Sequence, residues 1–137
     1  MSTRTPELTQ VYIDGASRGN PGPAGAGAVF FNAKGDRIAE LSRALGETTN
    51  NVAEYLALVY ALQEAQARGW RRLAVKTDSE LLARQVNGQY KVRDATLRLF
   101  HDLACEMIRA MDECSIEHIS RSLNAQADRL AGRAVAR

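Results

Sequence analysis

Cysteine is scarce in this sequence, and long apolar runs are absent. The chain of 137 residues has two cysteines, and neither Cys105 nor Cys114 belongs to a CxxC pair or has a histidine at zinc-ligand spacing. We therefore expect two reduced thiols and no zinc site. No apolar run approaches the roughly 20 residues that cross a membrane, and residues 1–10 lack the apolar stretch of a signal peptide. These absences favour a cytoplasmic protein without membrane contact.

The net charge is small as well. It is +2, so charge alone neither identifies nor excludes a nucleic-acid-binding protein. Hydrophobic residues make up 45% and charged residues 25% of the chain, which is typical of a globular protein and predicts no extensive disorder. The length suits one compact domain, and no internal repeat or linker divides it. We predict a single domain over residues 1–137, in which residues 1–8 form a flexible N-terminal extension.

The residue pattern changes along the chain from that of strands to alternating strands and helices. Three β-favouring segments come first, followed by an Ala- and Leu-rich helix that Gly69 ends. This order predicts an α/β fold with a five-stranded mixed sheet flanked by helices. The predicted strands are 9–14, 26–32, 37–45, 72–78 and 115–120, the predicted helices are 51–68, 79–87, 95–111 and 124–137, and 19–23 is a predicted loop.

Four acidic residues fall at the ends of these elements. Asp14 ends the first predicted strand and Asp78 the fourth, so they lie side by side if those two strands are neighbours. Glu54 and Asp128 lie near the starts of two helices, from which they can converge on the same place. Clustered carboxylates repel one another unless a cation is bound, and their hard oxygen ligands suit magnesium or manganese. Two such ions roughly 3.5–4 Å apart would support phosphate chemistry.

Each acid also has an ordinary structural explanation. Asp14 precedes a glycine and can be a turn residue, Glu54 can favour a helix N-terminus, and Asp78 can cap a helix. Asp128 can simply face solvent. Spacing alone therefore leaves the metal site and these separate structural roles both open.

Four segments in order resemble type 1 ribonuclease H and together extend over nearly the whole chain. Residues 12–25 (YIDGASRGNPGPAG) resemble its first strand and glycine-rich loop, and residues 48–55 (TTNNVAEY) its TNNxxE helix start. Residues 77–79 (TDS) resemble its third acidic segment, and residues 124–131 (NAQADRLA) its final helix. The resemblance implies a ribonuclease H-like fold and hydrolysis of the RNA strand of RNA–DNA hybrids, giving 5′-phosphate and 3′-hydroxyl products.

The resemblance also implies roles for the four carboxylates. Asp14 would contact both of two Mg²⁺ ions, for which Mn²⁺ can substitute. Asp128 would complete the site of the ion that activates the nucleophile, while Glu54 and Asp78 would hold the ion at the leaving group. Catalysis would then rest on positioning and charge stabilisation, with no side-chain nucleophile.

Substrate binding is implied for a second group of residues. Glu54 and the backbone near three residues of the first motif would engage the 2′-hydroxyl that distinguishes RNA from DNA. A threonine would bind a phosphate of the DNA strand, and three asparagines would contact the two strands, although ordinary loop hydrogen bonds explain such residues as well. These residues are Gly15, Ala16 and Ser17 for the backbone contacts, Thr49 for the phosphate, and Asn20, Asn50 and Asn51 for the two strands.

Two departures from the family pattern alter these expectations. Many bacterial members carry a lysine-rich protrusion that binds substrate. The corresponding segment here, residues 88–95, is short and only slightly basic, so the chain resembles a compact branch without the protrusion. Weaker binding to the nucleic-acid backbone follows. Four basic residues are either a partial replacement or simply a solvated face: Lys76, Arg84, Lys91 and Arg93.

The second departure concerns a histidine that many members have in a loop before the last helix. His118 precedes the corresponding loop and falls on a predicted strand, where a structural role is the simpler hypothesis. Arg121 is the better candidate for attracting phosphate or releasing product. It cannot act as a general base, because its guanidinium stays protonated.

Two other functions remain as alternatives. A non-catalytic nucleic-acid-binding module on the same fold is disfavoured, because four acids without metal would weaken phosphate binding. Another nuclease or strand-transfer enzyme of this architecture is the second alternative, because fold alone does not decide function, but the TNN segment and the GNPG loop favour ribonuclease H. We expect a monomer whose macromolecular partner is the RNA–DNA hybrid.

Overall fold

The computed structural model describes residues 6–135, and their order of elements is the predicted one with one short 3-10 helix added. β1 begins at Leu8, so the extension expected over residues 1–8 cannot include Leu8. Residues 1–5 of that extension lie outside the described residues. In chain order the elements are β1 (Leu8–Ser17), β2 (Gly22–Phe31), β3 (Arg37–Thr48), α1 (Asn50–Arg68), β4 (Arg72–Thr77), α2 (Glu80–Val86), α3 (Ala95–Arg109), β5 (Glu113–His118), η1 (Arg121–Leu123) and α4 (Ala125–Val135).

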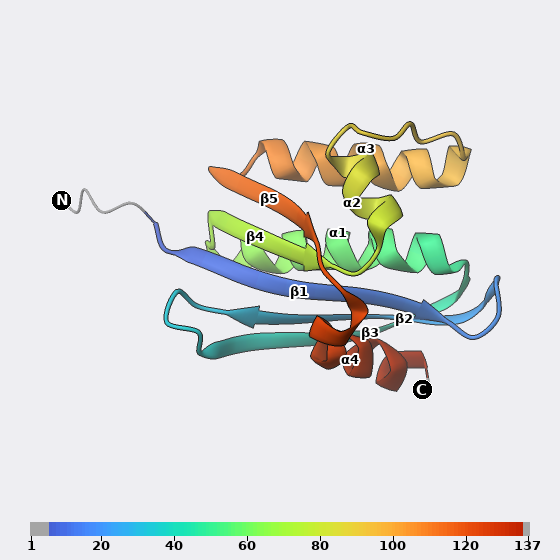
Figure 1. The fold of residues 1–137 in the computed structure, drawn as a ribbon, viewed down its shortest axis with the longest axis horizontal. Helices are drawn as coiled ribbons and strands as arrows, with labels where there is room; N and C mark the ends of the chain where they lie inside the picture. The colour runs from blue at the N-terminus through green and yellow to red at the C-terminus, as the bar shows by residue number, and fades with distance from the viewer. Residues whose placement is uncertain (1–5, 136–137) are drawn as a thin grey trace.

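The five strands form one mixed sheet, as predicted, in the order β3-β2-β1-β4-β5 (Figure 1). β1 pairs with β2 antiparallel and with β4 parallel, so β1 is the central strand at which the direction of the sheet changes. β4 pairs with β5 in parallel. Its pairing with β1 ends at Ile13 opposite Thr77. The next residues along the two strands, Asp14 and Asp78, therefore leave the sheet beside each other.

Helices cover the two faces unequally. α1 packs on β1 and β2 and is itself covered by α3, whereas α4 lies alone on the opposite face against β2, β1 and β3 (Figure 1). Alternation along β1 explains the core, since Val11 and Ile13 are fully buried beneath α1. The intervening residues of β1, Asp14 among them, point to the face of α4.

Side-chain caps begin three of the four α-helices. Thr49 accepts a hydrogen bond from the backbone N–H of Val52 at the start of α1, and Ser79 does the same for Leu82 in α2. Asp94 caps α3 in the same way. Gly69 ends α1 in the left-handed conformation, as its sequence position predicts. None of the helices in the described region is both long and apolar enough to cross a membrane.

The main departures from the predicted boundaries lie near the glycine-rich loop. Asp14 does not end its strand, because β1 continues to Ser17 beside β2 alone. Gly22 and Pro23, predicted as loop, already belong to β2, where they pair with Thr48 and Glu47 of β3. Pairing with β3 therefore overrides the loop-like composition of this segment. β5 is also shifted from the predicted 115–120 to Glu113–His118.

Candidate active site

Asp14 and Asp78 meet where β1 and β4 separate. Asp14 is held in β1 by pairing with Gly27 of β2, and Asp78 follows directly after Thr77, the last residue of β4. Their expected position side by side at the carboxyl end of the parallel strands is confirmed, since each belongs to one compact carboxylate cluster. Only 5% of the Asp14 surface is exposed, so this carboxyl group is largely withdrawn from water.

Glu54 joins the two aspartates because α1 approaches β1 unusually closely. Gly15 makes this possible: a Cβ there would lie 2.2 Å from the carbonyl carbon of Ala53 and 2.4 Å from the backbone nitrogen of Glu54. The backbone N–H of Gly15 donates to Oε1 of Glu54 at 2.6 Å. A glycine beside Asp14 therefore fixes both the distance of the helix and the direction of its carboxylate.

The three carboxylates are close enough to share a cation. Asp14, Glu54 and Asp78 each offer one oxygen, and these oxygens lie within 4.8 Å of one another. Burial raises the pKa of Asp14 to about 9, and the neighbouring charges of Glu54 and Asp78 add to the effect. Burial likewise raises the pKa of Glu54 to about 8, although the hydrogen bond from Gly15 opposes the change. The cluster therefore resists full ionisation by itself, and hard oxygen donors of this kind fit a divalent cation such as Mg²⁺ or Mn²⁺.

Asp128 reaches this cluster from α4, on the face of the sheet opposite to α1. α4 packs tightly on β2 because a Cβ at Gly27 would lie 2.4 Å from the carbonyl oxygen of Ala127, and one at Gly25 would lie 2.4 Å from that of Ala131. Asp128, in the first turn of α4, raises the pKa of Asp14 through a shared hydrogen bond and through its charge. Its own side chain is exposed. The structure thus brings all four predicted carboxylates to one place, with Asp128 on the solvent side.

Arg121 is the cation that acts on this cluster from the segment before α4. It lies in the 3-10 helix η1, which no sequence pattern predicted, and its charge lowers the pKa of Glu54. Its exposed guanidinium forms no ion pair within residues 6–135. His118 is the last residue of β5, as the strand prediction implied, but its side chain is exposed. That exposure gives it little to contribute to packing.

The predicted substrate-binding residues surround the N-terminus of α1 and the end of β1. Oδ1 of Asn20 accepts a hydrogen bond from the backbone N–H of Asn50 at 3.0 Å, which joins the glycine-rich loop to this helix. Thr49 caps the helix, and Asn50 and Asn51 are exposed. Asn20 and Thr49 therefore do make the ordinary loop contacts that the sequence left open. The remaining three, Gly15, Ala16 and Ser17, occupy the last part of β1, where the N–H of Gly15 is already taken by Glu54.

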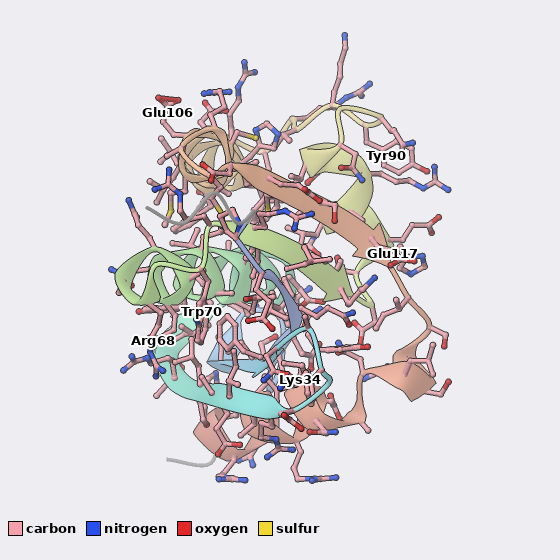
Figure 2. The ribbon with its side chains drawn as sticks, turned by 90° about the vertical axis from the view of Figure 1, so that its left-hand side faces the viewer. Lys34, Arg68, Trp70, Tyr90, Glu106 and Glu117 are labelled. Atoms are coloured by element: carbon pink, nitrogen blue, oxygen red, sulfur yellow. The ribbon has the colours of Figure 1, made fainter. Side chains whose placement is uncertain are left out.

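The basic residues considered as a replacement for the protrusion are differently placed. Within residues 6–135, only eight residues separate α2 from α3, and no additional helix lies between them. Tyr90, labelled in Figure 2, lies in this short connection, away from the sheet. Lys76 is paired with Glu117, and Arg84 with Glu80. Lys91 and Arg93 are exposed.

Asn124 is a buried site residue that the sequence placed only at the start of the last helix and in its motif. Its amide group donates to the carbonyl oxygen of Ile13 at 2.8 Å and to Oδ2 of Asp78 at 3.1 Å. An asparagine at the start of a predicted helix indicates a cap. Nothing in the sequence could show that its partners are a residue of β1 and the residue that follows β4.

A mixed sheet of order 3-2-1-4-5 with carboxylates on its central strand, after β4 and on two helices defines the ribonuclease H-like class of metal-dependent nucleases. Residues 12–134 match the family described as "Reverse transcriptase-like". The chain belongs to that family, and within it to the compact type 1 ribonucleases H.

Three relatives support this assignment. Ribonuclease HI of Halobacterium salinarum is 41% identical over 90% of this chain, and its crystal structure superimposes with a TM-score of 0.92, covering 94% of this chain and 98% of that one. LC11-RNase H1, isolated from compost, was solved in complex with an RNA/DNA hybrid and is 41% identical, with a TM-score of 0.88 and coverage of 93% and 96%. The N-terminal RNase H domain of a Mycobacterium tuberculosis protein is 39% identical, with a TM-score of 0.89 and coverage of 93% and 98%.

The curated relatives are longer than this chain. It spans 62% of the length of the Halobacterium salinarum protein and 35% of the bifunctional Mycobacterium tuberculosis protein. What those whole proteins do is therefore a separate matter from what the matched domain shares.

Proposed function

We propose that this protein is an endoribonuclease that hydrolyses the RNA strand of RNA–DNA hybrids and leaves 5′-phosphate and 3′-hydroxyl products. One observation carries the proposal: three carboxylates on separate elements place their oxygens within 4.8 Å of one another. Such a cluster can be fully ionised near neutral pH only when a cation is bound, which is the arrangement needed for phosphoryl chemistry. The hybrid bound to LC11-RNase H1 supports the choice of substrate.

The carboxylates divide the work according to their positions. Asp14 interacts with all three other acids, and burial raises its pKa to about 9, which suits the residue shared by two cations. Asp128 would complete one cation site, while Glu54 and Asp78 would complete the other. When bound, the two Mg²⁺ ions would activate the attacking water and stabilise the leaving oxygen, and Mn²⁺ can replace them.

The surrounding residues would hold and select the substrate. Arg121 would attract the phosphate or help to release the product, since its guanidinium is exposed beside the acids. Recognition of the 2′-hydroxyl would fall to Glu54 and the backbone of Gly15, Ala16 and Ser17. The DNA strand would lie against the N-terminus of α1, where Thr49, Asn50 and Asn51 are held next to Asn20. We also propose a monomer that acts in the cytoplasm as a single domain.

A panel of labelled substrates tests this function. We expect cleavage of an RNA–DNA hybrid with Mg²⁺ or Mn²⁺ and none with a chelator, and products whose ends are 5′-phosphate and 3′-hydroxyl. Duplex DNA and single strands serve as controls in the same buffer. Equal cleavage of duplex DNA, or no cleavage of any substrate, would refute the proposal.

A further inference from the structure

Asn124 occupies the N-cap position of α4 without capping it. The side chain is buried, with 1% of its surface exposed. An asparagine at this position ordinarily uses Oδ1 to accept a hydrogen bond from the second or third N–H of the helix. Among the described residues, however, Oδ1 of Asn124 has no hydrogen-bond partner. The other three α-helices each begin at a side chain that does accept such a bond.

The amide group of Asn124 is turned instead toward two oxygens of the carboxylate site. Nδ2 donates to the carbonyl oxygen of Ile13 at 2.8 Å and to Oδ2 of Asp78 at 3.1 Å. Both partners are acceptors, so only the nitrogen can face them, and the orientation of the amide is fixed. This orientation leaves α4 without a side-chain cap and a buried oxygen without a donor, and each of these lowers stability.

A single amide thereby connects three of the elements that carry the acids. Ile13 immediately precedes Asp14 in β1, Asp78 follows β4, and Asn124 stands one helical turn before Asp128. The fourth acid, Glu54, is held separately by the N–H of Gly15. Asp78 is half-buried, and without the amide its carboxylate is free to turn toward water, away from the like charges of its neighbours.

We propose that Asn124 is a positioning residue: it fixes the carboxylate of Asp78 against that of Asp14 so that the pair binds a divalent cation. This inference rests on the proposed function, because it assigns Asn124 to the same metal site. A hydrogen bond to one oxygen of Asp78 restricts rotation of the carboxylate and presents the second oxygen in a constant direction. Removal of a residue that hydrogen-bonds to a metal ligand commonly lowers metal affinity or activity by about 10–100-fold.

Two substitutions separate positioning from helix capping. Asn124→Ala removes the amide, whereas Asn124→Ser also removes it but restores a hydroxyl that can cap α4. Asn87→Ala is the matched control, because Nδ2 of Asn87 donates to the carbonyl oxygen of Ile116 at 3.0 Å and touches no acid. For every variant, the rise in Tm with Mn²⁺ concentration gives the metal affinity in the absence of substrate. Urea unfolding in a chelator gives the stability, and hybrid cleavage gives kcat and KM.

We expect Asn124→Ser to unfold at nearly the same urea concentration as the wild type in chelator. Both Asn124 variants should nevertheless bind Mn²⁺ about tenfold or more weakly. Their kcat should fall and partly recover at high metal concentration, with KM for the hybrid unchanged within about twofold. Asn87→Ala should retain wild-type Mn²⁺ affinity.

Mn²⁺ affinity and kcat of Asn124→Ser within about twofold of the wild type would overturn the inference and leave Asn124 a structural residue. A comparable loss of Mn²⁺ affinity in Asn87→Ala would overturn it too, because the effect would then not depend on contact with Asp78. If the wild type binds Mn²⁺ but cleaves no hybrid, the proposed function fails while the Mn²⁺ comparison still decides the role of Asn124.

Discussion

Gly15→Ala is expected to disable the site without introducing any polar or charged group. An alanine Cβ would lie 2.2 Å from the carbonyl carbon of Ala53, whereas ordinary van der Waals contact begins near 3.4 Å. The backbones of β1 and α1 must therefore separate by about 1.2 Å, the difference between these distances. Backbone atoms on both sides prevent relief by a side-chain rotation. The 2.6 Å hydrogen bond from Gly15 to Glu54 would lengthen with this movement.

The magnitude follows from the displacement. Overpacking of this kind costs about 1–3 kcal/mol of unfolding free energy, and misplacing a catalytic group by about 1 Å costs on the order of 100-fold in rate. We expect kcat for hybrid cleavage to fall by about that factor while the protein stays folded at 25 °C. Circular dichroism and urea unfolding measure the stability, and initial rates at saturating hybrid measure kcat.

Gly132→Ala provides the matched control. Gly132 lies inside α4, and a Cβ there meets no atom within 4 Å. Alanine should therefore stabilise the helix, by up to about 1 kcal/mol, and leave turnover unchanged. Wild-type kcat in Gly15→Ala would refute the reasoning, because it would mean that the contact between β1 and α1 does not set the position of Glu54.

Three further predictions concern charge. Asp14→Asn should lower turnover at least about 100-fold, since cation binding supplies several kcal/mol of charge stabilisation, yet its Tm in chelator at pH 8 should equal or exceed that of the wild type; retained activity or a lower Tm would contradict this. Because the pKa of Asp14 rises from its ordinary 3.8 to about 9 on folding, the metal-free folded state holds a proton that the unfolded chain has lost. The unfolding free energy of the metal-free protein should then fall as pH rises between these two pKa values, by up to about 1.4 kcal/mol per pH unit for each proton. Thermal scans with and without Mg²⁺ should show that the metal raises Tm more at pH 8.5 than at pH 6. Equal rises in Tm at the two pH values would exclude the mechanism. Arg121→Ala should reduce kcat/KM about tenfold, whereas His118→Ala should change it less than twofold. Arg71→Ala, which breaks an exposed ion pair at the far end of β4, is the control and should also change kcat/KM less than twofold. A larger loss in His118→Ala than in Arg121→Ala would move the role in phosphate attraction or product release from Arg121 to His118.

The sequence placed the four acids at or near the ends of strands and helices because each is next to a strong local signal, and the resemblance to ribonuclease H joined them into one site. Asp78 follows an apolar strand, and Glu54 lies in the first turn of a helix that Gly69 ends clearly. The fold class followed from the order of such segments. Whether Asp14 and Asp78 meet depended on the pairing of β1 with β4, which the sequence could state only as a condition.

Features that depend on distant contacts were not predictable. Gly22 and Pro23 have a loop-like composition, and only their pairing with β3 makes them part of a strand. The donors chosen by Glu54 and Asp78 likewise come from other segments of the chain. The short η1 helix carries no apolar period of its own, so no pattern revealed it.

The point at which β1 loses β4 as a neighbour also constrains how activity can arise during folding. Side chains alternate between faces along a strand, so a slip of one residue between β1 and β4 would turn Asp14 away from Asp78 and toward the apolar layer beneath α1. The two strands are separated by β2, β3 and α1 in the sequence, and such distant pairings form late relative to local structure. Recovery of hybrid cleavage after denaturation is therefore a readout of correct register across the centre of the sheet, and it should lag behind the recovery of helical signal.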